Sequence, residues 1–411
     1  MELVLIKALA FLRPIFDMDT GIKFAGVSAF ELAGILFSSS LALVLFIVMA
    51  TRKDTRFSLI DLLILGFTSW CLAVSLIYFD KSDLKEVAKY IVPFMSYPVA
   101  RMVMRDVKQY RQTMLLMIIG LSIPAVLSAI LIVQGKSLFF INFWTGVPRY
   151  KGMYEGEHNM AHDMTFLIML LGIYLLVREP LSEGEQVKKG GASKLLLLLP
   201  LGLACIALYN TYMSSVRTTL VGLFLFGAIV ITTHHKKGKV LLVVGVVAIL
   251  LLVGLNSSVQ ERYFREAAQA KRDPTFTDLE YGSGRPRIWR EYFENFFAMP
   301  VDRQLAGVGI GNWHDKGDWP VYLDAHNDFI NVLVFTGYIG FALFIALQIA
   351  ILRKILTIES REKYVFLALF VAVAAMNFVS NSYVTRFGLA QMYYLTLAYI
   401  EIPRRRTHDT T

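Results

Sequence analysis

Long apolar runs recur along the chain and restrict its fold more than any other feature. An α-helix rises 1.5 Å per residue, so about 20 consecutive apolar residues cross the hydrocarbon core of a membrane, and the runs have about this length. Of the 411 residues, 56% are hydrophobic and 18% are charged, whereas a soluble domain keeps about a quarter of its residues charged. The sequence therefore excludes the soluble globular classes and predicts an all-α, polytopic membrane helix bundle.

We expect about 11 or 12 membrane helices. The segment 1–16 is apolar, but it is short and is interrupted by Lys7, Arg13 and Pro14, so it is either a first span or a helix lying in the membrane interface. The other runs cover residues 26–50, 57–79, 87–104, 112–134, 160–177, 195–212, 216–233, 239–256, 327–352, 363–383 and 387–402.

Lysine and arginine residues concentrate in alternate connections between these runs. When the runs are threaded in order, the basic connections all fall on one side, which the positive-inside rule assigns to the cytoplasm. The net charge of +9 is therefore interpreted as a topology signal and not as a sign of nucleic-acid binding. The basic segments are residues 51–56, 101–111, 178–194, 235–239, 353–363 and 404–411.

The opposite, outer side carries the longer connections, residues 134–159 and 257–325. Long loops of this kind are usually functional. In the second loop, aromatic and aliphatic residues alternate with charged ones at helical spacing, which predicts an amphipathic helix over 286–299 that lies along the outer surface or caps the bundle. The predicted organisation is an N-terminal transmembrane bundle at 1–256, a long outer loop at 257–325, C-terminal transmembrane helices at 326–403 and a basic cytoplasmic tail at 404–411.

His326 opens a predicted helix at its outer end and is the strongest single candidate for chemistry. Gly337 follows eleven residues later, and eleven residues of α-helix return to within about 20° of the same face. Gly340 extends this stripe, and small residues let a neighbouring helix approach, so we expect His326 to face protein. A helix N-terminus disfavours the charged imidazolium and would keep the ring available as a base. The alternative is an interfacial histidine satisfied by backbone groups.

Two arginines at outer helix ends are candidates for binding an anion. Arg217 follows a polar break between apolar runs, where an unpaired charge is costly. Arg285 precedes the amphipathic helix, whose free amide groups already favour an anion. Arginine presents a planar fork of donors that suits phosphate oxygens. The alternative is that either arginine pairs with a carboxylate, and Asp278 and Glu280 are available in the long loop.

Lys81 and Arg386 are weaker candidates at the ends of outer connections. Each adds positive potential to an outer pocket, although anchoring at the membrane edge is the commoner role of such residues. Gly307 and Gly309 alternate as in a nucleotide-binding loop, but no predicted strand precedes them, so they are interpreted as turn glycines.

A metal site is not predicted. Asp17 and Asp19 place two carboxylates in the first outer segment, which is compatible with a divalent ion bound to a diphosphate. Two carboxylates at this spacing are common by chance. His158 and His162 have the spacing of a metal-binding pair on a helix, but the sequence gives no third ligand.

Together these features resemble the O-antigen ligase family, within a superfamily that also holds O-antigen polymerases and protein O-oligosaccharyltransferases. The superfamily motif is a His, then Asn, Ser or Gln, nine free positions, Gly, two further positions, and Gly, Thr or Tyr. Here His326, Asn327, Gly337 and Gly340 match it in full. The motif is specific for the superfamily and separates its members poorly.

The resemblance implies a GT-C-type glycosyltransferase in the bacterial inner membrane, with its active site in the periplasm and no metal, nucleotide sugar or other cofactor. The implied donor is a glycan on undecaprenyl diphosphate, and the acceptor is the outer-core sugar of lipid A-core. Arg217 and Arg285 resemble the arginines of this family that precede the motif.

Charge then predicts the mechanism. Arg217 and Arg285, helped by Lys81 and Arg386, would neutralise the departing diphosphate. Neutral His326 would take the proton of the acceptor hydroxyl, and a single displacement would invert the anomeric carbon. Asn327 would orient the acceptor or a loop.

Three other functions share these features. A polymerase would use a second lipid-linked glycan as acceptor, and a protein ligase would use a protein. A lipid-linked glycan transporter would be expected to have broken helices in two related halves, and the sequence gives no such pairing.

Overall fold

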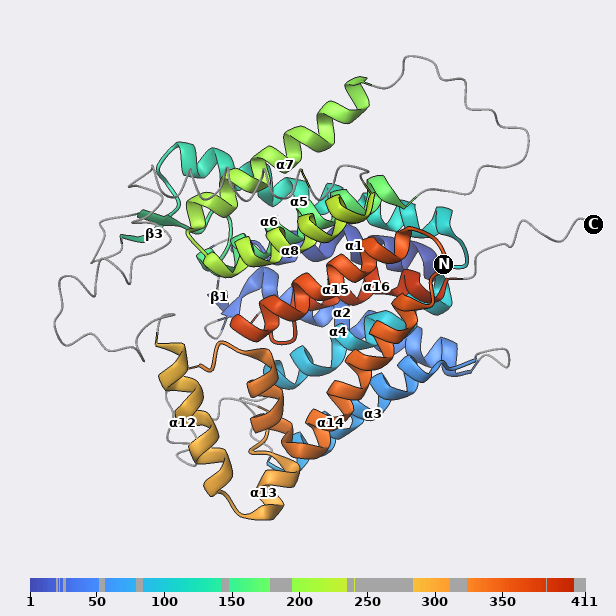
Figure 1. Ribbon diagram of the computed structural model, residues 1–411, viewed down its shortest axis with the longest axis vertical. Coiled ribbons are helices and arrows are strands. Elements are labelled where there is room, and N and C mark those ends of the chain that lie inside the picture. Colours follow the sequence, from blue (N-terminus) through green and yellow to red (C-terminus); the bar gives the residue numbers. More distant parts are fainter. Residues whose placement is uncertain are drawn as a thin grey trace, which may run out of the picture.

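The computed structural model describes residues 1–19, 21, 23–24, 27–51, 56–78, 84–141, 148–177, 194–234, 240, 284–310, 324–381 and 383–402. These residues form an all-α bundle with two short strand pairs (Figure 1). The helices of the first part are α1 (Glu2–Phe16), α2 (Ala29–Ala50), α3 (Leu59–Ile77), α4 (Leu84–Val103), α5 (Val107–Val133), α6 (Glu157–Leu176), α7 (Lys194–Ser214) and α8 (Arg217–His234). The later helices are α12 (Arg285–Ala298), α13 (Val301–Ala306), α14 (Asp328–Leu356), α15 (Glu362–Val379), α16 (Phe387–Leu397) and the 3₁₀ turn η4 (Ala398–Glu401).

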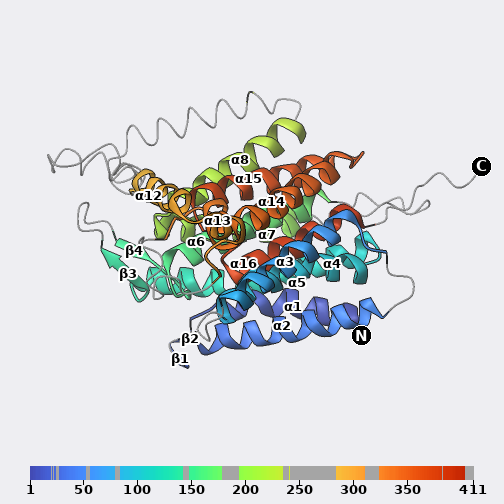
Figure 2. The ribbon, with the colours of Figure 1, turned by 90° about the horizontal axis from the view of Figure 1, so that it is seen from below.

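Both strand pairs are antiparallel and lie in connections. Strands β1 (Lys23–Phe24) and β2 (Val27–Ser28) pair Lys23 with Ser28, and β3 (Leu138–Ile141) and β4 (Pro148–Tyr150) pair Leu138 with Tyr150. The β3–β4 pair and α12 lie towards the same side of the molecule, away from the N-terminus (Figures 1 and 2). This side carries the candidate site described below.

The helical membrane fold predicted from the sequence is confirmed. Among the described helices, α3, α5, α6, α8, α14 and α15 are long and apolar enough to cross a membrane, and shorter apolar stretches lie at 29–44 and 198–214. Each run predicted between 26 and 233 and between 327 and 402 forms a helix within a few residues of its expected bounds. The run predicted at 239–256 lies outside the described residues, apart from residue 240.

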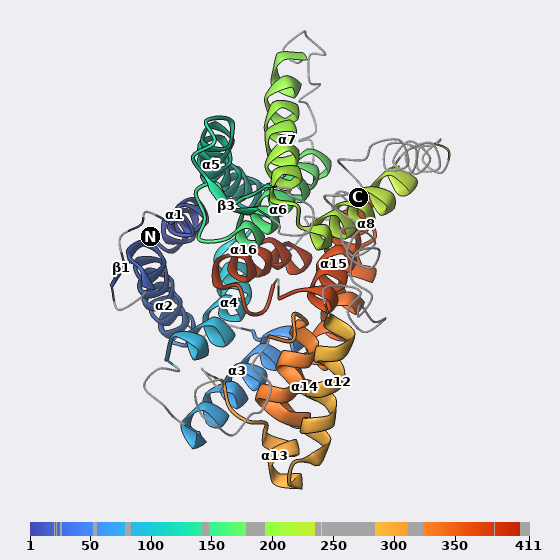
Figure 3. The same cartoon turned by 90° about the vertical axis from the view of Figure 1, so that its left-hand side faces the viewer.

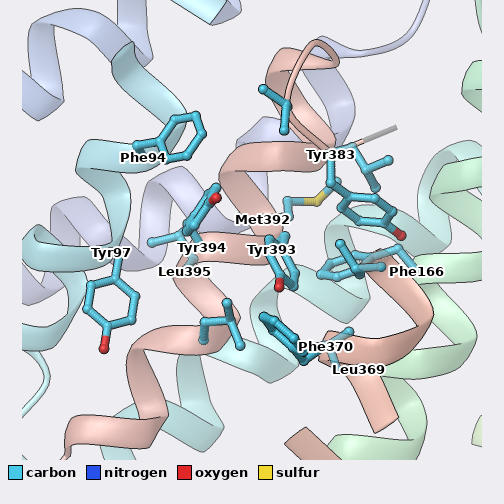
Figure 4. Packing of buried hydrophobic residues seen from close by; sticks show 14 of the residues in the cluster. Phe94, Tyr97, Phe166, Leu369, Phe370, Tyr383, Met392, Tyr393, Tyr394 and Leu395 are labelled. Carbon is cyan, nitrogen blue, oxygen red and sulfur yellow. The ribbon is translucent and has the colours of Figure 1, made fainter. Parts of the chain in front are cut away.

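Helix α16 lies at the centre of the bundle, between α4, α6, α15 and α1 (Figure 3). All of its residues are buried. Its aromatic side chains reach two neighbouring helices, because the Tyr394 ring packs 4.6 Å from that of Phe94 on α4 and the Tyr393 side chain points towards Phe370 of α15 (Figure 4). A fully buried helix is apolar around its whole circumference, which explains why α16 looks like a membrane span in sequence.

Helix α14 contains a break that the sequence analysis did not predict. Gly337 has φ 64° and ψ −171°, a conformation far from helical. His326 precedes the helix with φ 48°, and Asn327 is the N-cap. The expectation that His326 and Gly337 share one face of a continuous helix is therefore wrong, because the helical repeat starts only at Asp328 and does not continue through Gly337.

The break frees backbone carbonyl groups, and two other segments satisfy them. The first is the turn after α13, where Gly307 and Gly309 have φ of 88° and 98°. The second is α3, through the side chain of Trp70. A β-carbon on Gly307 would lie 2.4 Å from the carbonyl oxygen of Phe335, so only glycine allows this approach. The bonds run from Val308 N to Val334 O (2.9 Å), from Gly309 N to Phe335 O (3.2 Å) and from Trp70 Nε1 to Thr336 O (2.8 Å).

The predicted amphipathic helix is confirmed as α12. Its residues Ile288, Tyr292 and Phe296 are buried, and Phe297 is exposed. Trp289 donates its indole N–H to the carbonyl oxygen of Ala325, at 2.7 Å. This hydrogen bond links α12 to Ala325, the residue that precedes His326.

Candidate functional site

His326 lies at the junction between an outer connection and α14, and it is half-buried. Its backbone N–H donates to Asp324 Oδ1 at 3.2 Å. The next residue, Asn327, caps the helix, because its Oδ1 accepts from the backbone N–H of Phe329 at 2.9 Å and of Ile330 at 3.1 Å. The Asn327 side chain therefore stabilises the first turn of α14.

A network of amide and carboxylate groups surrounds the start of α14. Asn331 Nδ2 lies 3.4 Å from Asp324 Oδ1 and donates to Asn381 Oδ1 at 3.1 Å. The amide of Asn381 in turn donates to Asp324 Oδ2. This network joins the connection that carries His326 to the segment that follows α15.

That segment also positions Arg386. Asp328, in the first turn of α14, accepts from the backbone N–H groups of Tyr383 at 3.1 Å and Val384 at 3.2 Å, and from the Thr385 hydroxyl at 3.1 Å. Arg386 Nε donates to the carbonyl oxygen of Asn381 at 2.6 Å. Asp324 and Asp328, on either side of His326 in the sequence, both bind the segment that carries Arg386. These bonds fix the position of Arg386 relative to His326.

The surroundings of His326 favour an uncharged ring. Burial lowers the pKa of His326, Asp324 opposes this effect, and the positive charges of Arg285 and Arg386 lower the pKa further. Three residues predicted from the sequence, His326, Arg285 and Arg386, are therefore close enough to interact electrostatically. A lowered pKa favours the neutral imidazole, and the charges that contribute to it are those of two arginines, a combination that suits proton removal near a bound anion.

The other two predicted cations are Arg217 and Lys81. Arg217 is half-buried and begins α8. Gly222, five residues later, packs so closely on Met376 that a β-carbon would lie 2.5 Å from its sulfur, so the start of α8 lies along the end of α15. Lys81 lies outside the described residues.

A cavity of about 400 Å³ adjoins this cluster. Asp324, Asn331, Asn381 and Arg386 form one part of its wall. The rest comes from the end of α1 and the segment after it, from α2, α4, α6 and the residues before it, from Ile310, from Phe335 of α14, and from Thr385 and the start of α16. The polar network around His326 thus continues into the wall of this cavity.

The acids considered for a metal site line this cavity but are engaged by cations. Asp17 pairs with Arg13, and Asp19 lies 3.2 Å from Lys151 Nζ. Burial raises the pKa of Asp17 to about 6, against the effect of Arg13. Within the described segments, no group of three or more His, Cys, Asp or Glu side chains is arranged to hold a metal ion.

The two histidines of α6 form a stacked pair. The rings of His158 and His162 lie 6.4 Å apart, centroid to centroid, and His162 Nε2 is 3.4 Å from the Ser380 hydroxyl. They adjoin the segment that carries Asn381 and Arg386.

The two motif glycines of α14, Gly337 and Gly340, allow other parts of the chain to pack closely against this helix. A β-carbon on Gly337 would lie 2.3 Å from the carbonyl oxygen of Leu305, and one on Gly340 would lie 2.8 Å from Trp70 Cδ1. Gly337 contacts the end of α13, and Gly340 contacts α3.

Sequence reasoning missed the residues that organise the site: Asp324, Asp328, Asn331 and Asn381. One signal was available, because acids stand two residues before and two residues after His326. Asn381 belongs to a polar break between two apolar runs, similar to the break that drew attention to Arg217.

A comparison with known protein families matches part of the chain. Residues 202–345 match the family model described as O-antigen ligase. The matched segment contains Arg217, Arg285 and the whole motif from His326 to Gly340. The chain matches no curated protein. The chain is thus a polytopic helical membrane protein whose segment 202–345 is similar to the O-antigen ligase family.

Proposed function

We propose that the protein is an O-antigen ligase, a GT-C-type glycosyltransferase that moves a glycan from undecaprenyl diphosphate to the outer-core sugar of lipid A-core. The reaction would complete lipopolysaccharide on the periplasmic face of the bacterial inner membrane. The family match at residues 202–345 supports the superfamily. The observation that carries the chemistry is that burial and the positive charges of Arg285 and Arg386 lower the pKa of the half-buried His326.

The arginines stabilise the leaving group in this proposal. As the bond between the anomeric carbon and the phosphate oxygen breaks, its electron pair passes to the diphosphate, and negative charge grows there. Arg285 and Arg386 neutralise this charge from fixed positions, which is worth most where water is excluded. Arg217, at the start of α8, is proposed as a further diphosphate ligand, and Lys81 as a weaker helper.

His326 acts as the general base. Its neutral ring takes the proton of the acceptor hydroxyl while that oxygen attacks the anomeric carbon from the side opposite the diphosphate. One displacement inverts the configuration at this carbon. Asp324 fixes the backbone of His326 and raises the basicity of the ring, so it acts as a positioning residue.

The topology proposed with this function follows the distribution of basic residues. The cytoplasm holds the tail at 404–411, and the periplasm holds the connection at 257–325, whose described part contains α12 and α13. The transmembrane parts are then 1–256 and 326–403. The partners are the lipid-linked donor, lipid A-core and membrane lipids.

The experiment that tests this function is a transfer assay with purified protein and three acceptors in parallel: lipid A-core, a second undecaprenyl-diphosphate-linked glycan and an acceptor protein. We expect transfer to lipid A-core, insensitive to excess chelator. Transfer to the second lipid-linked glycan would identify a polymerase, and transfer to protein would identify a protein O-oligosaccharyltransferase.

A further inference from the structure

The cavity beside Arg386 contains a buried carboxyl group that has no use in the proposed chemistry. Asp163 of α6 is 4% exposed and lines the cavity. Its Oδ2 is buried and makes no hydrogen bond of standard geometry with the described residues. A buried polar atom without a partner costs about 1–3 kcal/mol, so native proteins rarely keep one unless a ligand or water completes it.

Two more polar groups lie near this carboxyl group. The hydroxyl of Tyr154 is also buried, and it interacts with the Asp163 carboxyl group without forming a hydrogen bond of standard geometry. Asn159, one turn earlier on α6, lines the same cavity. Together they offer a carboxyl, a phenol and an amide, which are groups that exchange hydrogen bonds with alcohols.

The charge of the cavity restricts the ligand. Seven of its described lining residues are acidic and three are basic. Arg386, whose charge acts on His326, belongs to the wall that Asp324 and Asn381 also form, whereas Asp163 and Asn159 come from α6. A ligand with a carboxylate would meet like charges in the acidic part, which disfavours it.

We propose that this cavity is a carbohydrate subsite that accepts the hydroxyl groups of a non-acidic sugar, with Asp163 as its central hydrogen-bonding group. The inference deepens the glycosyltransferase function proposed above and rests on it. The sugar lies beside Arg386, so it belongs either to the end of the donor glycan next to the diphosphate or to the acceptor. Both sources offer the same ring hydroxyl groups.

The first test measures binding without turnover. Purified protein in lipid nanodiscs is examined by saturation-transfer NMR with methyl glucoside and with methyl glucuronide. We expect saturation of the glucoside and little of the glucuronide, and Asp163→Val should reduce the glucoside signal about tenfold. Asn159→Leu should reduce it as well, and this second variant serves if Asp163→Val does not fold.

A matched control is Asp302→Val, on the exposed face of α13. It removes a carboxyl group far from the cavity lining and should leave the glucoside signal unchanged. Equal signals for the unmodified protein and for both cavity variants would overturn the proposal, as would preferential binding of the glucuronide.

A second test separates the two sources of the sugar. In the transfer assay, Asp163→Val should raise KM about tenfold for the donor if the subsite holds the donor glycan, or for the acceptor if it holds that sugar. An unchanged KM for both substrates would overturn the subsite even if transfer is normal. Glucoside binding that depends on Asp163 in a protein that transfers no glycan would instead overturn the glycosyltransferase function and keep the subsite.

Discussion

Trp70 donates its indole N–H to the carbonyl oxygen of Thr336, 2.8 Å away, directly before the break in α14. The non-helical backbone at Gly337 leaves carbonyl groups without partners inside the helix. This bond and those from the turn at Gly307 and Gly309 satisfy them. The helix that begins after His326 is thus held by α3 and by the segment after α13.

Gly337→Ala should destabilise the protein strongly. The backbone conformation of Gly337 is one that essentially only glycine adopts, and forcing another residue into such a region costs about 1–3 kcal/mol. The added β-carbon would also lie 2.3 Å from the Leu305 carbonyl oxygen. Thermal unfolding in detergent should show a lower midpoint. Gly202→Ala is the control, because Gly202 is helical with open space around it, and it should leave stability equal or improve it by about 0.5–1 kcal/mol.

His326→Ala should abolish the proposed transfer without unfolding the protein. Removing a general base lowers the rate by about 10²–10⁴-fold, and His326 is only half-buried. The measurement is turnover in the transfer assay, with glycan ladders of complemented cells as a second readout. His234→Ala, at the far end of α8, should retain full turnover. Normal ladders from the His326 variant would rule out its role as base.

Arg285→Lys and Arg287→Lys should differ, although both residues lie in the first turn of α12. Arg285 is half-buried and acts on His326, whereas Arg287 is exposed and lies 3.9 Å from Glu291. Lysine keeps the charge but loses the planar fork that binds two phosphate oxygens. We expect kcat/KM to fall about 10–100-fold for Arg285→Lys and less than about twofold for Arg287→Lys. Equal effects would exclude Arg285 as a diphosphate ligand.

The sequence was sufficient for the membrane class, the helices and three members of the charged cluster. Long apolar runs predict helices directly, because a segment in lipid has to form all of its backbone hydrogen bonds internally. His326 and Arg386 were found at the outer ends of such runs, and Arg285 was found at the start of the amphipathic helix, where free amide groups favour an anion.

The break in α14 and the network around His326 were not predictable in this way. Gly337 looks like a packing glycine in a continuous helix, and only its contact with Gly307, thirty residues earlier in the chain, reveals the non-helical backbone. Asp328 likewise looks like an ordinary first-turn acid, but it binds the backbone of residues 383 and 384. Both depend on pairings between segments far apart in sequence.

The pKa of His326 should respond in opposite directions to its two charged neighbours. Arg386 lowers this pKa and Asp324 raises it. Because the neutral ring is the proposed base, the unmodified protein should keep its rate down to below the ordinary histidine pKa of about 6.5 and lose it at more acid pH. Arg386→Gln removes a positive charge, so it should raise the pKa, whereas Asp324→Asn removes a negative charge and should lower it.

Titration of the His326 ring by NMR, in protein with ¹³C-labelled histidine, measures these shifts even where the variants are inactive. The resonance is assigned by its loss in His326→Ala. Glu294→Gln, on the exposed face of α12, should leave the titration unchanged. If Arg386→Gln fails to raise the pKa, Arg386 does not act on the imidazole, and the diphosphate would then have to be held by Arg285 and Arg217 without it.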